Sequence, residues 1–355
     1  MHHKRLFPCL AAAAALLAGA LAAAPARAQQ QPPQQRPAAG SSGSPTLDAV
    51  RERRLLLCGV SGESPGFSLP DSRGEMQGLD ADTCRAVAAA ALGDAKLVRF
   101  VPLSPQARFT ALQSGEVDLL VRNTSWTLTR EASLGLLMAW INFHDGTAFV
   151  VKADAGVKSA KELDGATVCL LQGTSTELDV TEWFRANNLR FTPVLFGGVS
   201  ETQAAFLANR CDAWANDASY IAAFRASQPN ANLALLPDRV SSEPVGAMVR
   251  KGDDRWFDLV RWTGAALLAA EQAGITSANA EEKRCSPDPG TQRLLGAQGD
   301  LGKALGVDNA WALNAIKQVG NYAEIWDRNL APLGLDRGAN RLASQGGLMW
   351  APPLR

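Results

Sequence analysis

Apolar positions of the chain fall into short runs that alternate with amphipathic segments, and this pattern predicts an α/β protein. Runs such as Leu55–Val60 are bounded by Gly and polar residues, as buried strands are. An Ala-rich segment from Asp80 has helical spacing, with Asp80 or Asp82 as the expected N-cap. Strand–helix alternation predicts a mostly parallel sheet. The expected elements are strand 55–60, helix 80–92, strand 96–102, helix 105–114 and strand 117–121.

A second alternation follows in the same order, which predicts two similar lobes. The unit A-L-Q-S-G-E-V-D-L at 111–119 has a counterpart in F-L-A-N-R-C-D-A at 206–213. Each unit is the end of a helix, a turn and the start of a strand. The expected elements of the second set are strand 166–171, helix 174–187, strand 191–196, helix 201–208 and strand 211–214.

Two similar segments mark the places where the chain would pass between these lobes. Gly146–Asp154 and Gly246–Asp254 are short apolar runs that lead into a basic residue and Asp. A chain that leaves one lobe and later returns needs two crossings, so we expect a two-strand hinge and a cleft that can close. Two ordinary edge strands are the alternative. Lobe 1 is then 46–145 with 246–355, and lobe 2 is 146–245.

The chain after Asp254 has the pattern of helices that extend lobe 1. Helical spacing covers 255–273 and segments around 291–305 and 308–329. Trp311 and Trp326 fall within these segments, and we expect them to pack against lobe 1 rather than to form a binding stripe.

The first 28 residues have the parts of a secretory signal peptide. His2-His3-Lys4-Arg5 gives a basic start, Leu10–Ala24 is apolar, and Ala26-Arg27-Ala28 fits the small-residue cleavage rule. A membrane anchor is the alternative, but the apolar run is shorter than the ~20 residues that a span needs. Residues 29–45 are rich in Gln, Pro, Gly and Ser and are expected to be a disordered linker.

Charge and histidine content argue against several functions. The 35 Lys and Arg residues balance 35 Asp and Glu, and loss of the first 28 residues would leave a net charge of −3. No basic run appears, so nucleic acid is not an expected partner. His144 is the one histidine after the predicted signal peptide, which disfavours Ser-His and Cys-His catalysis. We expect it at a turn or a cleft rim. Neither a metal nor a cofactor is expected, since C-x-x-C spacing is absent.

Five cysteines remain after the predicted signal peptide, and export would permit disulfides. They are Cys58, Cys84, Cys169, Cys211 and Cys285. Cys58–Cys84 and Cys169–Cys211 are the local pairings, but spacing alone leaves other pairings open.

The segment Q-G-T-S-T-E at 172–177 follows an expected strand and opens an expected helix. Thr174 and Glu177 have the spacing of a capping box. Capping alone is the simpler interpretation. The functional interpretation is that free N–H groups at Thr174–Thr176 face an anion such as a small carboxylate. The segment is not a P-loop, because the Gly-Lys-Ser/Thr element is missing.

Two further segments complete a candidate site. Asp217 ends an expected strand, where ligands bind in open α/β sheets, although it is equally placed to cap the next helix. R-N-T-S-W-T-L-T-R at 122–130 follows another strand, and Ser125 or Thr127 is placed to cap a short helix that carries Arg130. An Arg fork binds a carboxylate bidentately. One lobe would then bind the carboxylate and the other the ammonium of a zwitterion.

Several segments of this sequence resemble those of a known family. From about Leu47 to its end the chain is similar to the family 3 solute-binding proteins of polar amino acid ABC transporters, and most of all to the general L-amino acid-binding periplasmic proteins. The segments that carry the resemblance are P-G-F-S at 65–68, R-F-T-A-L-Q-S-G-E-V-D at 108–118, R-N-T-S-W-T-L-T-R at 122–130, Q-G-T-S-T-E-L at 172–178, W-F-R-A-N-N at 183–188 and K-Q-V-G-N-Y-A-E-I at 317–325.

The resemblance implies a type II periplasmic-binding-protein fold whose two lobes close on an L-amino acid. It implies that Arg130 grips the ligand carboxylate, helped by the Ser125 backbone N–H and by Ser175. The ammonium would be received by Asp217 and the backbone carbonyl of Asn123. It also implies the bridges Cys58–Cys84 and Cys169–Cys211, one in each lobe, and leaves Cys285 unpaired.

Two candidate positions are less defined by the resemblance. Glu63 and Ser64 stand where relatives carry Gly and a bulky apolar residue. Glu63 either borders the side-chain pocket, which would favour basic or polar side chains, or faces solvent. Trp126 is expected as a pocket wall, with a core position as the alternative.

The predicted function is a periplasmic receptor that passes L-amino acids to the membrane permease of an ABC transporter. We expect a monomer without catalytic activity. A periplasmic dehydratase on the same fold, with Glu63 as the acid, is one alternative. A sensor that presents the bound amino acid to a membrane receptor is another.

Overall fold

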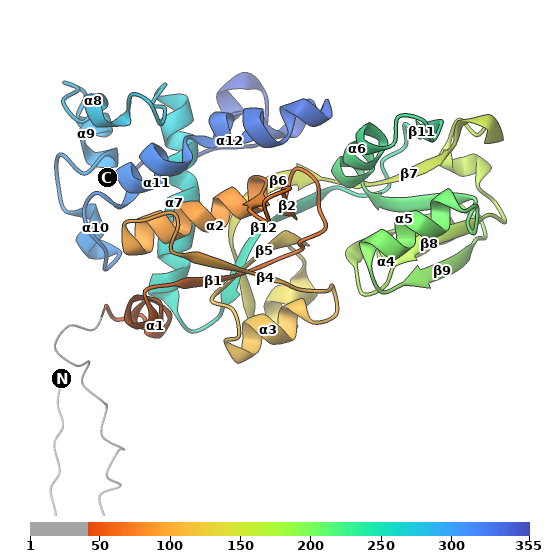
Figure 1. The fold of residues 1–355 in the computed structure, drawn as a ribbon, viewed down its shortest axis with the longest axis horizontal. Coiled ribbons are helices and arrows are strands. Elements are labelled where there is room, and N and C mark those ends of the chain that lie inside the picture. Colours follow the sequence, from red (N-terminus) through yellow and green to blue (C-terminus); the bar gives the residue numbers. More distant parts are fainter. Residues whose placement is uncertain (1–41) are drawn as a thin grey trace, which may run out of the picture. The chain divides into compact units, whose positions relative to one another are not determined.

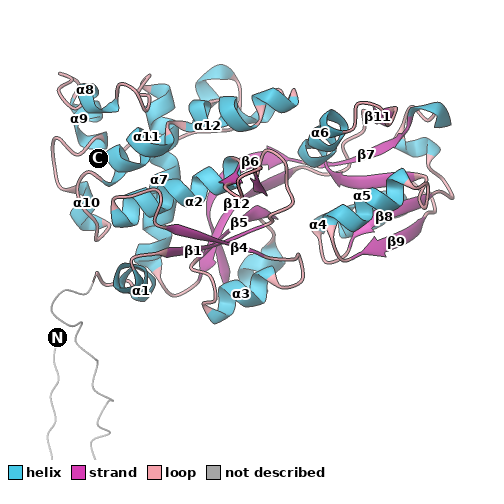
Figure 2. Ribbon diagram, in the orientation of Figure 1, coloured by secondary structure: helices cyan, strands magenta, loops and turns pink. Residues whose placement is uncertain are grey.

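The computed structural model of the protein describes residues 42–355, so the predicted signal peptide and nearly all of the predicted linker lie outside the described residues. The chain forms two five-stranded sheets, each covered by helices (Figures 1 and 2). None of the helices in the described part has both the length and the apolar character that a membrane crossing requires. The α/β class and two-lobe fold predicted from the sequence are confirmed.

The first lobe is built on a sheet whose strands run in the order β4-β1-β5-β12-β6. β1 is parallel to β4 and β5, whereas β12 is antiparallel to both β5 and β6. A two-stranded ribbon, β2 and β3, lies beside it. The strand bounds are β1 Leu56–Val60, β2 Leu69–Pro70, β3 Met76–Gln77, β4 Val98–Pro102, β5 Leu119–Ser125, β6 Leu136–Asp145 and β12 Glu243–Arg250.

The second lobe repeats this arrangement with the order β9-β8-β10-β7-β11. In each sheet three parallel strands are followed by an antiparallel strand that belongs to a crossing between the lobes. The repeat of elements in the sequence is therefore also a repeat in space. The strand bounds are β7 Thr147–Lys152, β8 Thr167–Leu171, β9 Thr192–Phe196, β10 Ala213–Asp217 and β11 Leu233–Leu235.

Helices cover both faces of each sheet, and those after β12 enlarge the first lobe. The largest apolar cluster joins α2, the sheet and the C-terminal helices, and it includes Trp311 and Trp326, which pack as expected. The helix bounds are α1 Pro45–Arg53, α2 Leu79–Leu92, α3 Arg108–Ser114, α4 Ser175–Ala186, α5 Val199–Leu207, α6 Ala218–Ser227, α7 Asp254–Gln272, α8 Ala280–Lys283, α9 Pro289–Leu294, α10 Leu301–Ala304, α11 Trp311–Val319 and α12 Tyr322–Asn329.

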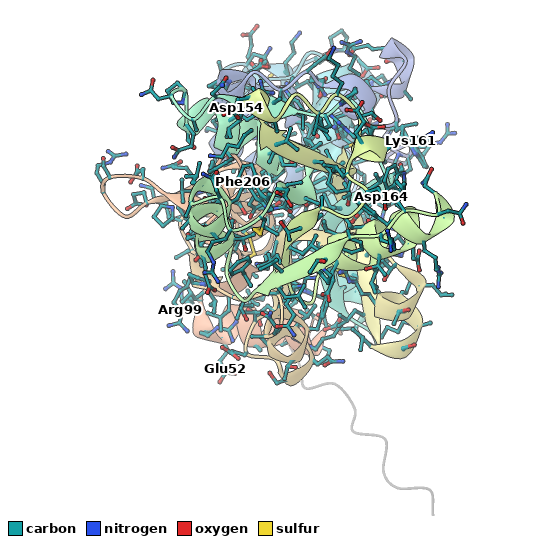
Figure 3. All side chains as sticks on the ribbon, turned by 90° about the vertical axis from the view of Figure 1, so that its right-hand side faces the viewer. Glu52, Arg99, Asp154, Lys161, Asp164 and Phe206 are labelled. Atoms are coloured by element: carbon teal, nitrogen blue, oxygen red, sulfur yellow. A yellow bond between two sulfur atoms is a disulfide. The ribbon has the colours of Figure 1, made fainter. Side chains whose placement is uncertain are left out.

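The two larger apolar clusters of the second lobe lie on opposite faces of its sheet. Phe206 of α5 is fully buried in one of them. Figure 3 looks onto this lobe, and Asp154, Lys161 and Asp164 are exposed on it. Charged side chains of both signs therefore face solvent at this end of the molecule.

Three local expectations are wrong at the ends of elements. The N-cap of α2 is Gly78 rather than Asp80 or Asp82, and both aspartates are buried within the helix. Asp80 instead accepts a hydrogen bond from the backbone N–H of Asn123, at 3.0 Å. The predicted linker ends earlier than residue 45, because Ser44 is buried and caps α1. Strand β5 continues past Val121 to Ser125, so the first four residues of the polar cluster are strand.

The chain crosses between the sheets twice, and the two crossings lie against each other. Gly146 links β6 to β7, and Ser241 lies just before β12. A Cβ atom on Gly146 would be 2.3 Å from the carbonyl oxygen of Ser241, so only Gly permits this approach. The Thr147 N–H donates to the Ser241 hydroxyl at 3.0 Å, and the Val240 N–H donates to the Thr147 carbonyl at 3.0 Å. The two-strand hinge predicted from the sequence is confirmed.

Each lobe contains one disulfide. Cys58 of β1 is bonded to Cys84 of α2 with the Cα atoms 6.2 Å apart. Cys169 of β8 is bonded to Cys211, just before β10, with the Cα atoms 5.6 Å apart. The two pairs are those that the family resemblance implies, and Cys285 is an exposed free cysteine.

Removal of the first disulfide is expected to lower the free energy of unfolding. The bridge closes a loop of 26 residues, so its loss should cost about 3–4 kcal/mol by chain entropy. The measurement is urea unfolding of a Cys58→Ser, Cys84→Ser variant followed by circular dichroism. Cys285→Ser is the matched control and should unfold like the wild type. An unchanged midpoint in the double variant would contradict the expectation.

Candidate functional site

The polar cluster after Val121 is shaped by a β-bulge in β5. The β12 partner of Val121 is Ala247, and the next β12 residue, Gly246, pairs with Thr124, so Arg122 and Asn123 are extra residues on β5. Asn123 has a φ of 44°, a left-handed conformation that Asn tolerates better than most residues. Bulges of this kind re-aim side chains. Here the bulge brings Arg122 and Asn123 to the wall of a cavity.

The start of α4 forms a second part of the site. The Thr174 hydroxyl accepts a hydrogen bond from the Glu177 N–H, which confirms Thr174 as the N-cap. Glu177 accepts from the Gly173 N–H at 3.0 Å rather than from Thr174, so the capping box is shifted by one residue. The positive end of the helix dipole lies at Ser175 and Thr176, which line the same cavity.

A third part comes from the carboxyl end of β10. Asp217 is buried, and its carboxylate accepts a hydrogen bond from the Asn123 side-chain amide at 3.2 Å. Burial raises the pKa of Asp217 well above its usual value, and the neighbouring Asp145 and Glu243 raise it further. A cation placed beside Asp217 would favour its ionised form and lower this pKa.

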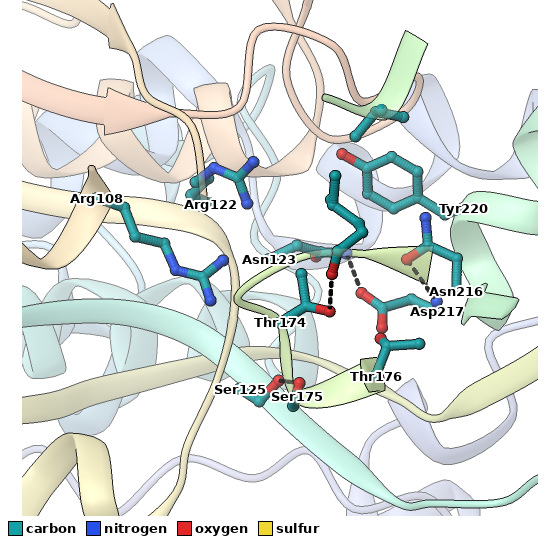
Figure 4. Close-up of a pocket in the computed structure, with 12 residues that line it drawn as sticks. Arg108, Arg122, Asn123, Ser125, Thr174, Ser175, Thr176, Asn216, Asp217 and Tyr220 are labelled. Carbon is teal, nitrogen blue, oxygen red and sulfur yellow. Dashed lines mark hydrogen bonds between the residues drawn. The ribbon is translucent and has the colours of Figure 1, made fainter. Parts of the chain in front are cut away.

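The cavity that joins these parts lies between the lobes (Figure 4). Its volume is about 390 Å³, including space open to solvent. Five of the predicted site residues line it. The full lining is Arg108, Arg122, Asn123, Ser125, Leu171, Thr174, Ser175, Thr176, Val199, Asn216, Asp217 and Tyr220.

The lobes also contact each other directly across this cavity. Besides the bond between Asn123 and Asp217, the hydroxyls of Ser125 and Ser175 are 2.9 Å apart. The Tyr220 hydroxyl of α6 lies 3.2 Å from that of Ser61. Each of these pairs joins one residue of the first lobe to one of the second. The walls of the cavity therefore depend on how closely the lobes approach.

A carboxylate from the hinge lies under the site. Glu243, the first residue of β12, accepts hydrogen bonds from the hydroxyls of Ser125 and Ser175, the latter at 2.7 Å. Burial opposes its ionisation, but hydrogen bonds from Asp179 and the surrounding hydroxyls outweigh burial and lower its pKa. Burial and the adjacent Glu243 raise the pKa of Asp179 to about 7. The two carboxyl groups thus favour a state in which Asp179 holds a proton and Glu243 is charged.

Three predicted site residues do not line the cavity. Arg130 is buried behind Ser125, donates to the Ser125 carbonyl at 2.6 Å and lies 5.1 Å from the centre of the Phe109 ring. Trp126 is neither core nor a wall of this cavity, because it is 45% exposed and its indole N–H donates to Glu131. Glu63 is exposed and accepts from the Val199 N–H at 3.2 Å.

Several lining residues were missed from the sequence. The cavity is also lined by Arg108, Arg122 and Tyr220. The two arginines are the first residues of segments that carry the family resemblance. Arg122 lies on a strand and Arg108 on a helix, and nothing in the local pattern says which face is buried against the other lobe. In the described part of the chain, no group of three or more His, Cys, Asp or Glu side chains is placed to hold a metal ion.

Comparison with known proteins identifies the family. Residues 56–281 match the model of the bacterial extracellular solute-binding proteins, family 3. The match covers both sheets and the crossings between them. The chain belongs to this family.

Curated relatives extend the similarity beyond the family model. The chain is 48% identical over 322 residues to the glutamate/glutamine/aspartate/asparagine-binding protein BztA of Rhodobacter capsulatus, across 89% of this chain and 95% of that protein. It is 44% identical over 323 residues to the general L-amino acid-binding periplasmic protein AapJ of Rhizobium johnstonii, with the same coverage of both chains.

A solved structure shares the whole fold. An ABC transporter periplasmic binding protein from Brucella ovis with glutathione bound is 46% identical and has a TM-score of 0.85. The similarity covers 87% of this chain and 99% of that one. The C-terminal helices therefore belong to the fold that the two proteins share.

The Asp179 side chain is expected to make stability depend on pH. Its pKa of about 7 in the folded protein exceeds the ordinary value of 3.8, so the folded protein binds more protons than the unfolded chain between these values. The free energy of unfolding therefore falls as the pH rises from about 4 to 7. Asp179→Asn removes this contribution, while the new amide can still donate to Glu243.

The measurement is the melting temperature of both proteins at several pH values from 5 to 8. We expect the variant to gain stability relative to the wild type as the pH rises. Asp154→Asn, at an exposed position of the same lobe, is the control and should follow the wild type. Parallel curves for wild type and Asp179→Asn would refute the assignment.

Proposed function

We propose that the protein captures free L-amino acids between its lobes and delivers them to the permease of an ABC transporter. The observation that carries this proposal is one interlobe cavity lined by both a buried acid, Asp217, and the N-terminus of α4. An ammonium suits the first and a carboxylate the second. The names of BztA and AapJ, each more than 40% identical over most of the chain, support amino acids as the ligands.

In this proposal the ligand carboxylate takes the backbone N–H groups of Ser125 and of the start of α4 at Ser175, because the hydroxyls of these two residues already donate to Glu243. The charge of Arg130 lies directly behind Ser125. The ammonium lies between Asp217 and the backbone carbonyl of Asn123. Both groups are in reach only when the lobes approach, so binding favours closure.

The partners and location follow from the same function. We propose that the chain is exported by residues 1–28, acts in the periplasm as a monomer and performs no bond chemistry. The lobes would divide at 145/146 and 245/246. Glu63, the candidate acid of the dehydratase alternative, is exposed and outside the cavity lining, which favours the binding function.

The central test is a thermal-shift screen of the exported chain against the twenty amino acids, small peptides and organic acids. A ligand at 100 times its Kd should stabilise the protein by about 2.7 kcal/mol, or roughly 5–10 °C. Deaminated analogues and simple amines are the controls and should shift the melting temperature less. The absence of a shift with any amino acid would refute the proposed function.

Arg130→Ala is expected to weaken binding of every amino acid by about 2–5 kcal/mol, because the ligand carboxylate loses its buried counter-charge. Isothermal titration calorimetry measures the change. Arg210→Ala is a matched control, since Arg210 also lies over a Phe ring but is exposed in the second lobe. Equal affinities for wild type and Arg130→Ala would exclude Arg130 as the carboxylate anchor.

A further inference from the structure

Two arginines in the cavity have no role in the amino acid site described above. Arg108 is the first residue of α3 and Arg122 lies in the β5 bulge, and their side chains are 2% and 6% exposed. Both line the cavity. Figure 4 shows them at one end of the cavity, with Asp217 and Tyr220 at the other.

Neither guanidinium has the hydrogen bonds that its burial demands. Arg122 donates through Nε to the Leu103 carbonyl at 2.7 Å, and no bond from its terminal nitrogens is formed within the described residues. Arg108 makes one long bond, 3.5 Å to the Gly173 carbonyl across the cleft, and its buried Nε has no partner in the described chain. Both terminal nitrogens of Arg122 and one of Arg108 therefore have no hydrogen-bond partner among the described residues.

The carboxylates that act on these arginines are too far away to form ion pairs with them. Among the described residues neither forms an ion pair, although the same lobe pairs other arginines closely. Arg337, for example, makes two bonds to Glu271, at 2.6 and 3.1 Å. A buried guanidinium that forms no ion pair is costly, so such a group is usually paired or serves a ligand.

Charged groups of both signs act on these arginines. Burial lowers the pKa of both arginines, and Arg108 is further affected by the nearby charges of Arg122 and Arg130. Asp80, Glu63 and Asp217 raise the pKa of Arg122, and Asp217 raises that of Arg108, but none of these acids forms an ion pair with either. Asp80, the acid behind Arg122, is held by the Asn123 N–H and by the Asn142 amide, at 2.9 Å. An anion in the cavity would therefore meet the guanidinium groups of Arg108 and Arg122, while Arg130 lies behind Ser125.

We propose that Arg108 and Arg122 form a second anion-binding subsite that selects L-amino acids with a carboxylate in the side chain. The inference rests on the proposed function, because the α-carboxylate and ammonium then occupy the α4 end and Asp217. The remaining end of the cavity receives the side chain. A planar guanidinium group donates two parallel hydrogen bonds to a carboxylate. An uncharged side chain accepts weaker hydrogen bonds from the same group.

The test compares acidic amino acids with their nearly isosteric amides. Ligand-free protein is titrated with L-glutamate, L-glutamine, L-aspartate and L-asparagine by calorimetry at pH 7. The wild type should bind each acid at least about tenfold more tightly than its amide, the difference expected for a charge-assisted bidentate contact. In Arg108→Met and Arg122→Met the affinity for L-glutamate should fall at least about tenfold, while that for L-glutamine changes less than about threefold.

Arg85→Met is the matched control, because Arg85, like Arg108, lies over a Phe ring in the first lobe but pairs with Asp82 away from the cavity. Circular dichroism and the melting temperature check that each variant folds. If an arginine variant does not fold, the ratio of acid to amide affinity in the wild type still decides the question.

Each result has one meaning. Equal wild-type affinity for acids and amides overturns the subsite and leaves the proposed function intact. Equal weakening of all four ligands in the variants assigns the arginines to the shared α-carboxylate and also overturns the subsite. Failure of the wild type to bind any amino acid overturns the proposed function and the subsite with it.

Discussion

The hydrogen bonds of Glu243 tie the two lobes to the hinge, and the geometry of the site depends on them. Its carboxylate accepts from Ser125 of the first lobe, Ser175 of the second, and Thr147 and Ser241 of the two crossings. A buried charge is tolerated when several donors surround it. Separation of the lobes would remove at least one of these donors, so the same carboxylate that fixes the hinge also favours the closed arrangement.

The bulge in β5 explains why a buried strand ends in a polar cluster. A regular strand would point alternate side chains into the two faces of the sheet, where apolar helices pack. The extra residues Arg122 and Asn123 leave that register, and the left-handed φ of Asn123 frees its N–H for Asp80. Strain of this kind is retained where function requires it. The cluster R-N-T-S is therefore part strand and part cavity wall.

The sequence predicted most of the fold because its periodicities are local. Alternating strands and helices, the repeat and the two crossings follow from runs such as Leu55–Val60 and from the paired segments at Gly146 and Gly246. The predicted ends of helices and strands were less accurate where tertiary contacts override the local helix or strand propensity. Asp80 looks like a helix cap but is needed by Asn123 and Asn142, two residues that only the folded sheet brings near it.

The candidate site was predicted in part for the same reason. Ser125, Ser175 and Asp217 follow strands or open a helix, and such positions are visible along the chain. How far Trp126 is buried and how closely Arg108 approaches the other lobe depend on how the lobes meet. The sequence of a single segment does not contain this information.

The distribution of charge in the cavity argues that its anions come from outside the chain. The interlobe carboxylates are already engaged, Asp217 by the Asn123 amide and Glu243 by hydroxyls. The guanidinium groups are buried on one lobe and do not form ion pairs within the described residues. Glu63 raises the pKa of Arg122 without forming an ion pair, and its carboxylate accepts from the Val199 N–H. A ligand with two carboxylates and one ammonium satisfies Arg108, Arg122 and Asp217 together, and a ligand with one carboxylate leaves donors unmatched.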